Sequence, residues 1–263
     1  MTVDVFADGS RRPGGTAFYS ALQAARLGQR ALIVTRGVER ELRQLLEPYA
    51  AELEIEVHPA ESTTTLRTSG EGAAREQRML SWAGPMGTEL VLDTDILHLA
   101  PVARETSARW GGRAEFVGLT PQGLVRTWKG EGGRITSAPL ATSLLPRRCQ
   151  AIVFSQSERE SCAELIDRAQ SLVAVTAAGG PTEIHLPGGE VIEVPVVAIE
   201  EVHDDLGAGD VFAAAFFIAL AEQRLPQEAA SFANAAAAVR IAGVGASAIG
   251  DRNAIRARAR QAP

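Results

Sequence analysis

The chain has 263 residues, of which 46% are hydrophobic and 22% charged, with a formal net charge of −6. This composition is typical of a globular protein, and the negative charge argues against a general nucleic-acid-binding surface. The sequence contains no signal peptide and no membrane-spanning apolar segment, and its two cysteines lack metal-binding or redox spacing, so we expect a cytoplasmic protein without nucleic-acid or membrane partners.

Strand and helix patterns alternate along the N-terminal part of the chain. Residues 2–6 are compatible with a short strand, and residues 16–27 with a helix that Gly28 ends. Residues 31–35 read Ala-Leu-Ile-Val-Thr, which is typical of a buried strand. A helix and a strand then follow, over residues 39–46 and 54–58.

The next segment departs from this alternation. Residues 62–68 are rich in β-branched residues, residues 69–72 are typical of a turn, and residues 77–82 can return as a second strand. We therefore predict a hairpin over about residues 60–83 that stands off the main sheet as a small lid.

The remaining chain returns to the alternating pattern. Its predicted strands cover residues 96–100, 114–119, 151–154 and 172–176, with a hairpin over 184–194. Its predicted helices cover residues 103–110, 158–169, 227–242 and 252–260. The alternation favours a single α/β domain over residues 1–263, with a mainly parallel central sheet and helices on both faces. Ligands of such sheets bind beyond the carboxyl ends of the strands.

The stretch that carries the chemistry is Asp-Asp-Leu-Gly-Ala-Gly-Asp over residues 204–210, followed by an apolar helix. Small residues at a helix N-terminus leave backbone N–H groups uncovered, and with the helix dipole they make an anion site. Asp210 lies in the first turn, where it can take a proton from a hydroxyl while the amides hold a phosphoryl group. An ordinary helix start is the structural alternative, because Gly and Asp are common there.

Several segments, in chain order, resemble the motifs of the ribokinase-like (PfkB) carbohydrate kinases. Residues 204–210 resemble the D-T-x-G-A-G-D signature, and residues 14–28 are similar to the N-terminal G-G-x-x-x-N signature with its A-x-L-G helix end. Thr176 resembles the Thr of the family's T-L-G nucleotide loop. Glu158 resembles the Glu of its N-x-x-E magnesium motif. Residues 232–238 resemble the family's adenine-side helix, and residues 243–246 resemble its adenine-side loop.

The resemblance implies a three-layer α/β/α sandwich and a role for each matching residue. Asp210 would be the catalytic base, with Gly207, Ala208 and Gly209 as the anion hole. Substrate-binding residues would be Asp4, Gly14, Gly15 and Tyr19. Residues around the nucleotide would be Thr176, Gly179, Asn234 and Gly245. The implied cofactors are ATP, Mg²⁺ near Glu158, and a monovalent cation such as K⁺ near Asp204 and the Leu206 carbonyl.

Three positions depart from the family motifs. Tyr19 stands where the family has Asn, which favours a bulkier or ring-shaped polyol, although Tyr19 can equally be a core residue. Asp205 replaces a Thr and adds negative charge near the phosphates, and Ser155 replaces the Asn of the magnesium motif.

We therefore predict an ATP-dependent phosphotransferase that acts on a hydroxyl of a small polyhydroxy substrate, a sugar or an inositol-like cyclitol. A nucleoside kinase on the same fold is one alternative, with Phe18 or Tyr19 stacking a base. A catalytically degenerate sensor that binds a nucleotide or sugar is another. We expect a monomer or a homodimer.

Overall fold

The largest sheet has six strands, in the order β15-β14-β13-β12-β8-β7. We describe residues 1–70, 75–87, 90–106, 110–167 and 170–261 of a computed structural model of the chain. The six strands are β7 (Val91–Leu99), β8 (Gly111–Leu119), β12 (Ala151–Ser155), β13 (Leu172–Thr176), β14 (Thr182–His185) and β15 (Val191–Val194). The pairings from β7 to β13 are parallel, whereas β14 and β15 are added antiparallel.

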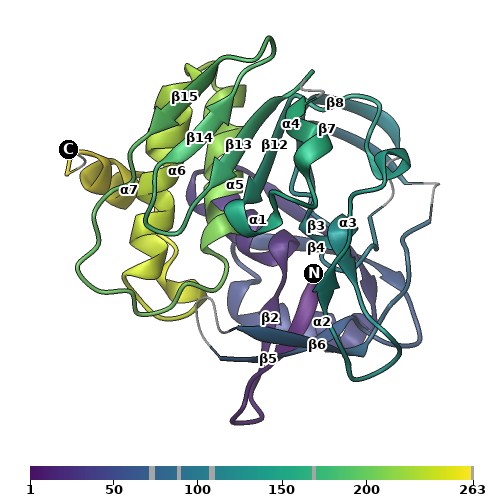
Figure 1. Ribbon diagram of the computed structural model, residues 1–263. Coiled ribbons are helices and arrows are strands. Elements are labelled where there is room, and N and C mark those ends of the chain that lie inside the picture. The colour runs from purple at the N-terminus through teal and green to yellow at the C-terminus, as the bar shows by residue number, and fades with distance from the viewer. Residues whose placement is uncertain (71–74, 88–89, 107–109, 168–169, 262–263) are drawn as a thin grey trace.

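Helices cover both faces of this sheet. The α-helices of the described residues are α1 (Thr16–Arg26), α2 (Glu39–Leu46), α3 (Gln122–Val125), α4 (Ala163–Asp167), α5 (Ala208–Ala221), α6 (Pro226–Ile241) and α7 (Arg252–Ala259). Figure 1 shows α5 and α6 behind strands β12 to β15, with α4 in front of the sheet. The predicted three-layer α/β/α arrangement is therefore confirmed.

The sequence of β12 explains the layering, because successive side chains of a strand point to opposite faces of the sheet. Ala151 and Val153 are buried in the larger core, which they share with residues of α1, α5 and α6. Ile152 and Phe154 are buried in the second core, with Leu165 of α4. A continuous apolar run, as in β12, is what a strand covered on both faces requires.

A smaller sheet carries the predicted hairpin. Its order is β10-β6-β5-β1-β2, formed by β1 (Thr2–Val5), β2 (Arg11–Gly14), β5 (Thr65–Ser69), β6 (Glu76–Ser81) and β10 (Gly133–Arg134). The antiparallel pairing of β5 with β6 confirms the hairpin, but residues 71–72 of its predicted turn lie outside the described residues. The hairpin is not isolated, because β5 also pairs in parallel with β1. The strand of Asp4 therefore belongs to this smaller sheet.

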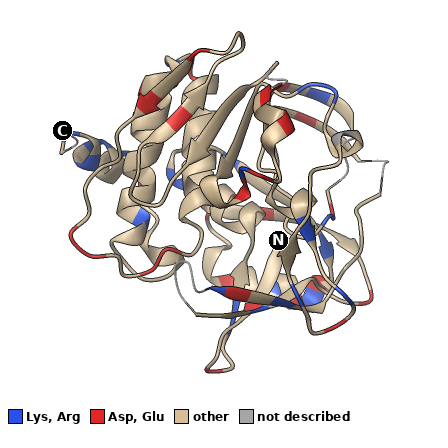
Figure 2. Cartoon of the chain, viewed as in Figure 1, with Lys and Arg blue, Asp and Glu red and all other residues tan. Residues whose placement is uncertain are grey.

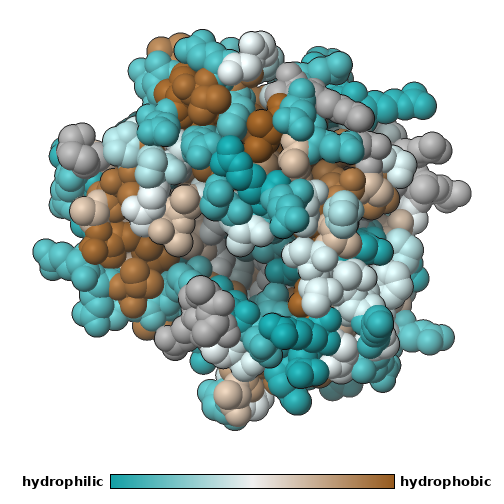
Figure 3. Space-filling view, in the orientation of Figure 1, coloured by the Kyte–Doolittle hydropathy of each residue, from teal (hydrophilic) through white to brown (hydrophobic). Residues whose placement is uncertain are grey.

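The remaining strands of the described residues form two two-stranded sheets. The parallel pair consists of β3 (Ala31–Gly37) and β4 (Leu53–Pro59), and the antiparallel pair of β9 (Arg126–Thr127) and β11 (Thr136–Ser137). In the space-filling view of Figure 3, separate apolar patches lie in a mostly hydrophilic face. Figure 2 shows basic residues on α7 and acidic and basic residues interspersed elsewhere. None of the described helices is long and apolar enough to span a membrane.

Two helix predictions are wrong. Residues 103–106 are not helical, because the Glu105 carboxylate accepts hydrogen bonds from the N–H groups of Val102 and Ala103 and holds a loop; residues 107–109 lie outside the described residues. The helix predicted over residues 158–169 is broken into the 3-10 helix η4 (Gln156–Glu158) and the short α4, and residues 168–169 are likewise not described.

Candidate active site

The N-terminus of α5 is built around Gly207. This residue is the N-cap and has φ of 80°, in the left-handed region where Gly carries no steric penalty. A Cβ at Gly207 would lie 2.4 Å from Cδ1 of Tyr19, so the ring of Tyr19 also requires glycine at this position. The Gly-Ala-Gly turn thus follows from two local constraints, a positive φ and a close aromatic ring.

A cavity of about 270 Å³ opens beside this turn. It brings together most of the residues predicted to form the site, namely Asp4, Gly15, Tyr19, Glu158, Thr176, Gly207, Gly209 and Asp210. Other predicted residues do not line it, namely Gly14, Ala208, Gly179, Asn234, Gly245 and Asp204. The cavity contacts the ends of β12 and β13 at Ser155 and Thr176, which places it at the carboxyl edge of the parallel strands.

Asp210 is held in the first turn of α5. Its backbone carbonyl accepts a hydrogen bond of 3.0 Å from Ser20 Oγ of α1. Burial raises the pKa of the Asp210 carboxyl to about 6, although the nearby guanidinium of Arg126 acts in the opposite direction. A carboxylate that titrates near neutral pH suits a general base, because it is ionised at pH 7 and still accepts a proton readily.

Asp4 reaches the same cavity from β1, where only 3% of its surface is exposed. Its Oδ1 accepts a hydrogen bond of 2.9 Å from Thr2 Oγ1, and burial raises its pKa to about 6. A Cβ at Gly14 would lie 2.2 Å from Asp4 Oδ2, so glycine at position 14 makes room for this carboxylate. Gly14 therefore leaves space for the Asp4 carboxylate and does not itself line the cavity.

The three predicted anion-hole residues are not equivalent. Gly207 and Gly209 line the cavity, but the N–H of Ala208 donates to the Asp205 carbonyl at 3.2 Å. This contact corrects the prediction for Ala208, whose amide closes the turn. The anion-hole prediction therefore rests on the amides of Gly207, the N-cap, and Gly209, in the first turn, where helix geometry leaves N–H groups without intrahelical partners.

Alanine substitutions at the two glycines should separate stability from activity. Gly207→Ala should lower the free energy of unfolding by about 1–3 kcal/mol, because its methyl group overlaps the Tyr19 ring. Gly209→Ala meets no atom within 4 Å and should keep the fold, but its methyl group would project into the anion site and lower turnover. Urea unfolding and turnover of both variants test this; equal stability losses at the two positions would contradict it.

Glu158 is both a helix cap and a lining residue of the cavity. Its Oε2 accepts hydrogen bonds from the Ser155 N–H at 2.8 Å and from Ser155 Oγ at 2.7 Å. This capping box fixes the carboxylate at the carboxyl end of β12. Ser155, which replaces the Asn of the family motif, therefore has a structural role that orients Glu158.

Acidic groups outnumber basic groups around the cavity. The charged lining residues are Asp4, Glu158, Asp205, Asp210, Arg75 and Arg126. A phosphoryl donor would meet this excess of negative charge, so the residues fit a divalent cation that is bound together with the donor. Within the described residues, no group of three or more His, Cys, Asp or Glu side chains could hold a metal without such help.

We expect Glu158→Gln to raise the Mg²⁺ concentration required for half-maximal turnover by about 10–100-fold, the range typical of outer-shell partners. The amide oxygen can still accept from the Ser155 N–H, so the unfolding midpoint should change little. Exposed Glu160 provides the matched control, as Glu160→Gln. A Mg²⁺ titration that is the same for wild type and Glu158→Gln would restrict Glu158 to its capping role.

The residues predicted to surround a nucleotide have different positions in the structure. Thr176 lines the cavity at the end of β13. Asn234 is buried, with its amide oxygen accepting from Thr182 Oγ1 at 2.9 Å and its amide nitrogen donating to the Pro195 carbonyl at 3.1 Å. We correct its assignment accordingly: the Asn234 side chain ties α6 to the β14–β15 region. Gly179 and Gly245 both have positive φ and no atom within 4 Å of an added Cβ.

Two arginines in the cavity were missed by the sequence analysis. Arg126 donates to the Val102 carbonyl at 3.2 Å and to Gln77 Oε1 at 3.0 Å, and its charge lowers the pKa of both Asp4 and Asp210, against the larger effect of burial. Arg75 forms an ion pair with Asp205. This pair offsets the negative charge that Asp205 adds, and it joins the smaller sheet to the loop before the anion site.

Tyr19 is a core residue that also lines the cavity. It is 5% exposed, and its ring lies against Phe18 with 5.2 Å between the ring centroids. The expected core position of Tyr19 is therefore confirmed, and its role toward a substrate stays a prediction. Phe18 is 1% exposed and packs on Tyr49, so its ring has no free face for stacking a base.

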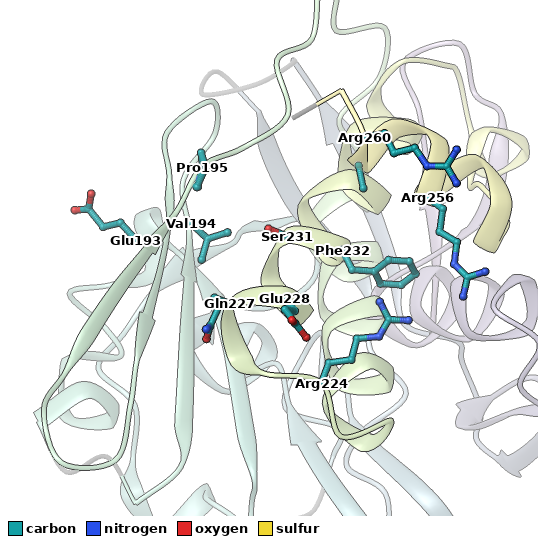
Figure 4. A pocket seen from close by; sticks show the side chains of 11 residues that line it. Glu193, Val194, Pro195, Arg224, Gln227, Glu228, Ser231, Phe232, Arg256 and Arg260 are labelled. Atoms are coloured by element: carbon teal, nitrogen blue, oxygen red, sulfur yellow. The ribbon is translucent and has the colours of Figure 1, made fainter. Parts of the chain in front are cut away.

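A second cleft lies between β15, α6 and α7 (Figure 4). The side chains labelled there include Val194, Phe232, Arg224, Arg256 and Arg260. None of the residues predicted from sequence to form the site lines this cleft. Most of the residues predicted to form the site therefore gather at the cavity beside Gly207.

Comparison with known proteins supports the family resemblance drawn from the sequence. Residues 140–252 match the model of the pfkB family of carbohydrate kinases, which confirms the resemblance to the ribokinase-like (PfkB) family. This match includes the loop before α5 and Asp210 itself. Comparison with curated protein sequences gave no match.

Solved structures share the fold at low sequence identity. A pyrophosphate-dependent kinase of the ribokinase family, complexed with a pyrophosphate analog and myo-inositol, is 19% identical, covers 93% of this chain and 94% of its own, and gives a TM-score of 0.74. Ribokinase from Arabidopsis thaliana, complexed with ribose and ATP, is 17% identical, with 98% and 96% covered and a TM-score of 0.72. Phosphofructokinase-2 from Escherichia coli, in complex with potassium, is 16% identical, with 98% and 95% covered and a TM-score of 0.63.

Proposed function

We propose that this chain, a ribokinase-like (PfkB) family kinase, transfers a phosphoryl group from ATP to a hydroxyl of a small sugar or cyclitol. The observation that carries the proposal is the placement of Asp210. Its carboxyl and the glycines at the N-terminus of α5 line one cavity, which would place a proton acceptor beside an anion site.

The reaction follows from this placement. The acceptor hydroxyl loses its proton to the Asp210 carboxylate while its oxygen forms a bond to the transferred phosphorus. The bond from that phosphorus to the bridging oxygen of the donor breaks, and the remaining nucleoside diphosphate, ADP, departs. The amides at Gly207 and Gly209 stabilise the charge on the transferred group, which is the larger part of what phosphoryl transfer requires.

The remaining cavity residues provide the acceptor site and the metal contact. Asp4 accepts hydrogen bonds from substrate hydroxyls, with Gly15 and Tyr19 beside it. Glu158 contributes to the outer shell of Mg²⁺, which, when bound with the donor, would neutralise phosphate charge. The smaller sheet, which carries Asp4 and contributes Arg75, acts as the lid over one domain that spans the whole chain.

Pyrophosphate is the second candidate donor. The engaged amide of Asn234 removes one of the contacts expected for a nucleotide, and a pyrophosphate donor needs only the anion site and the metal. The nucleoside kinase alternative loses support, because the rings of Phe18 and Tyr19 are packed in the core.

The test is a panel of sugars, cyclitols and nucleosides, assayed first with ATP and then with pyrophosphate. Formation of a phosphate ester is followed by phosphorus NMR, and acceptor-dependent ADP release by a coupled assay. We expect turnover with at least one polyol and none with a nucleoside. Binding of ATP without turnover on any acceptor would favour the sensor alternative.

A further inference from the structure

The guanidinium of Arg240 lies directly beneath the loop before α5. Arg240 is in the last turn of α6, and its side chain is completely buried. Its Nη1 donates to the carbonyls of Asp204 at 3.0 Å and Gly243 at 3.3 Å. Its Nη2 donates to Asp204 Oδ2 at 2.8 Å and to the Leu206 carbonyl at 2.6 Å.

The groups around this guanidinium are those a cation site would use. They comprise three backbone carbonyls and one carboxylate, and the face of the Tyr19 ring lies 5.8 Å from the guanidinium carbon. Burial raises the pKa of the Asp204 carboxyl, but hydrogen bonds from Arg240 and from the N–H groups of Leu206 and Gly245 prevail and lower it, so Asp204 remains charged.

The residues present therefore do not fit the monovalent cation implied by the resemblance. Asp204 and the Leu206 carbonyl, expected to ligate K⁺, are both hydrogen-bonded to Arg240. A K⁺ ion would need these same oxygen atoms and would lie beside a buried positive charge.

The position of the guanidinium also bears on the anion site. The Leu206 carbonyl points to Arg240, and a trans peptide is planar, so the N–H of Gly207 points in the opposite direction. Gly207 is a lining residue of the cavity. Arg240 thus fixes the orientation of a peptide whose amide serves the anion site, without contact with the reacting groups.

We infer that Arg240 is a built-in replacement for the monovalent cation, so that the anion site of this protein is assembled without K⁺. Arg240 is a positioning residue, and the kinetic part of the inference rests on the proposed function. The structural part of the inference, that a guanidinium already fills the cation site, does not depend on the proposed function.

The first experiment uses the wild-type protein. Thermal unfolding and, with the best acceptor, kcat and KM are measured in potassium chloride and in choline chloride at equal ionic strength. We expect both the unfolding midpoint and kcat to be the same in the two salts. A midpoint or kcat that rises specifically with K⁺ would overturn the inference, and this outcome requires no variant to fold.

The second experiment removes the guanidinium. Arg240→Ala leaves a cavity lined by the freed oxygen atoms, and we expect kcat in choline to fall by about 10²-fold, the loss typical of one anion-site donor. K⁺ should restore a large part of kcat and raise the unfolding midpoint, with acceptor KM changed less than kcat. Arg240→Lys keeps a positive charge in place and should remain independent of K⁺.

Arg26 is the matched control, because it too donates to backbone carbonyls, those of Ala246 and Ile249, and pairs with a carboxylate, that of Glu52. Arg26→Ala should lower the unfolding midpoint without creating a response to K⁺. The inference would be overturned if Arg240→Ala folds and neither its unfolding midpoint nor its kcat responds to K⁺. If no acceptor is phosphorylated, the proposed function fails, and the unfolding midpoints alone decide whether Arg240 occupies a cation site.

Discussion

Replacing Asp210 by asparagine is expected to lower kcat by about 10²–10⁴-fold, because an amide cannot accept the hydroxyl proton. The fold should persist, since the contact that anchors this residue, from Ser20 Oγ, is made to its backbone carbonyl. Binding of the donor should also persist, because the amides at Gly207 and Gly209 are untouched. Steady-state kinetics with the best acceptor and calorimetric titration with the donor measure the two effects separately.

The pH dependence adds a second readout for Asp210. Burial raises its pKa to about 6, so the base is protonated below that pH and kcat/KM should fall as the pH is lowered through 6. The stability effect has the opposite direction. Because the folded-state pKa is raised from 3.8 to about 6, protonation of Asp210 stabilises the folded protein at low pH. This contribution to the free energy of unfolding, up to about 3 kcal/mol, is lost as the pH rises through 6.

Asp210→Asn should therefore be more stable than the wild type at pH 8 and should lose that advantage near pH 4. Urea unfolding at the two pH values tests this. Asp205→Asn is the control, because its carboxylate lies in the same cavity but is paired with Arg75, and its effect on kcat should be much smaller. A near wild-type kcat in Asp210→Asn would remove Asp210 from the role of base.

The parts of the fold that were predicted correctly are those encoded by local patterns. The apolar runs at residues 151–154 and 172–176 gave two central strands, since strands covered on both faces need apolar residues at every position. The errors arose where a distant or side-chain contact decides the backbone. The segment from residue 103 has helical periodicity, but the Glu105 carboxylate binds the two N–H groups that would begin the helix.

The candidate site divides in the same way. Asp210 and its glycines form one continuous motif, so the sequence alone indicates their proximity. Arg126 and Arg240 are far along the chain from the aspartates they face, and neither lies in a motif whose spacing predicts the contact. Their positions are set by the packing of β9, which begins at Arg126, and of α6 against other elements, so these long-range contacts are visible only in the structure.

Asp4 is the residue whose replacement should most affect the acceptor. We expect Asp4→Ala to raise the acceptor KM by about 10²-fold while the donor KM is unchanged. Two hydroxyls that lose their acceptor cost about 1–2 kcal/mol each, and 1.4 kcal/mol corresponds to a tenfold change. The carboxylate is positioned for this contact, because it is buried in the cavity, held by Thr2 Oγ1 and backed by Gly14.

Two variants separate this role from a structural one. Asp4→Asn keeps the volume and one acceptor oxygen, so its KM should lie between those of the wild type and Asp4→Ala. Asp8→Ala removes an exposed carboxylate from the turn that follows β1, where it accepts from the Ser10 N–H, and should leave the acceptor KM unchanged. If Asp4→Ala folds and keeps the wild-type KM for every acceptor that turns over, Asp4 does not bind substrate. The hydroxyls must then be held from the Arg126 side of the cavity, where Arg126→Lys would be the next variant to measure.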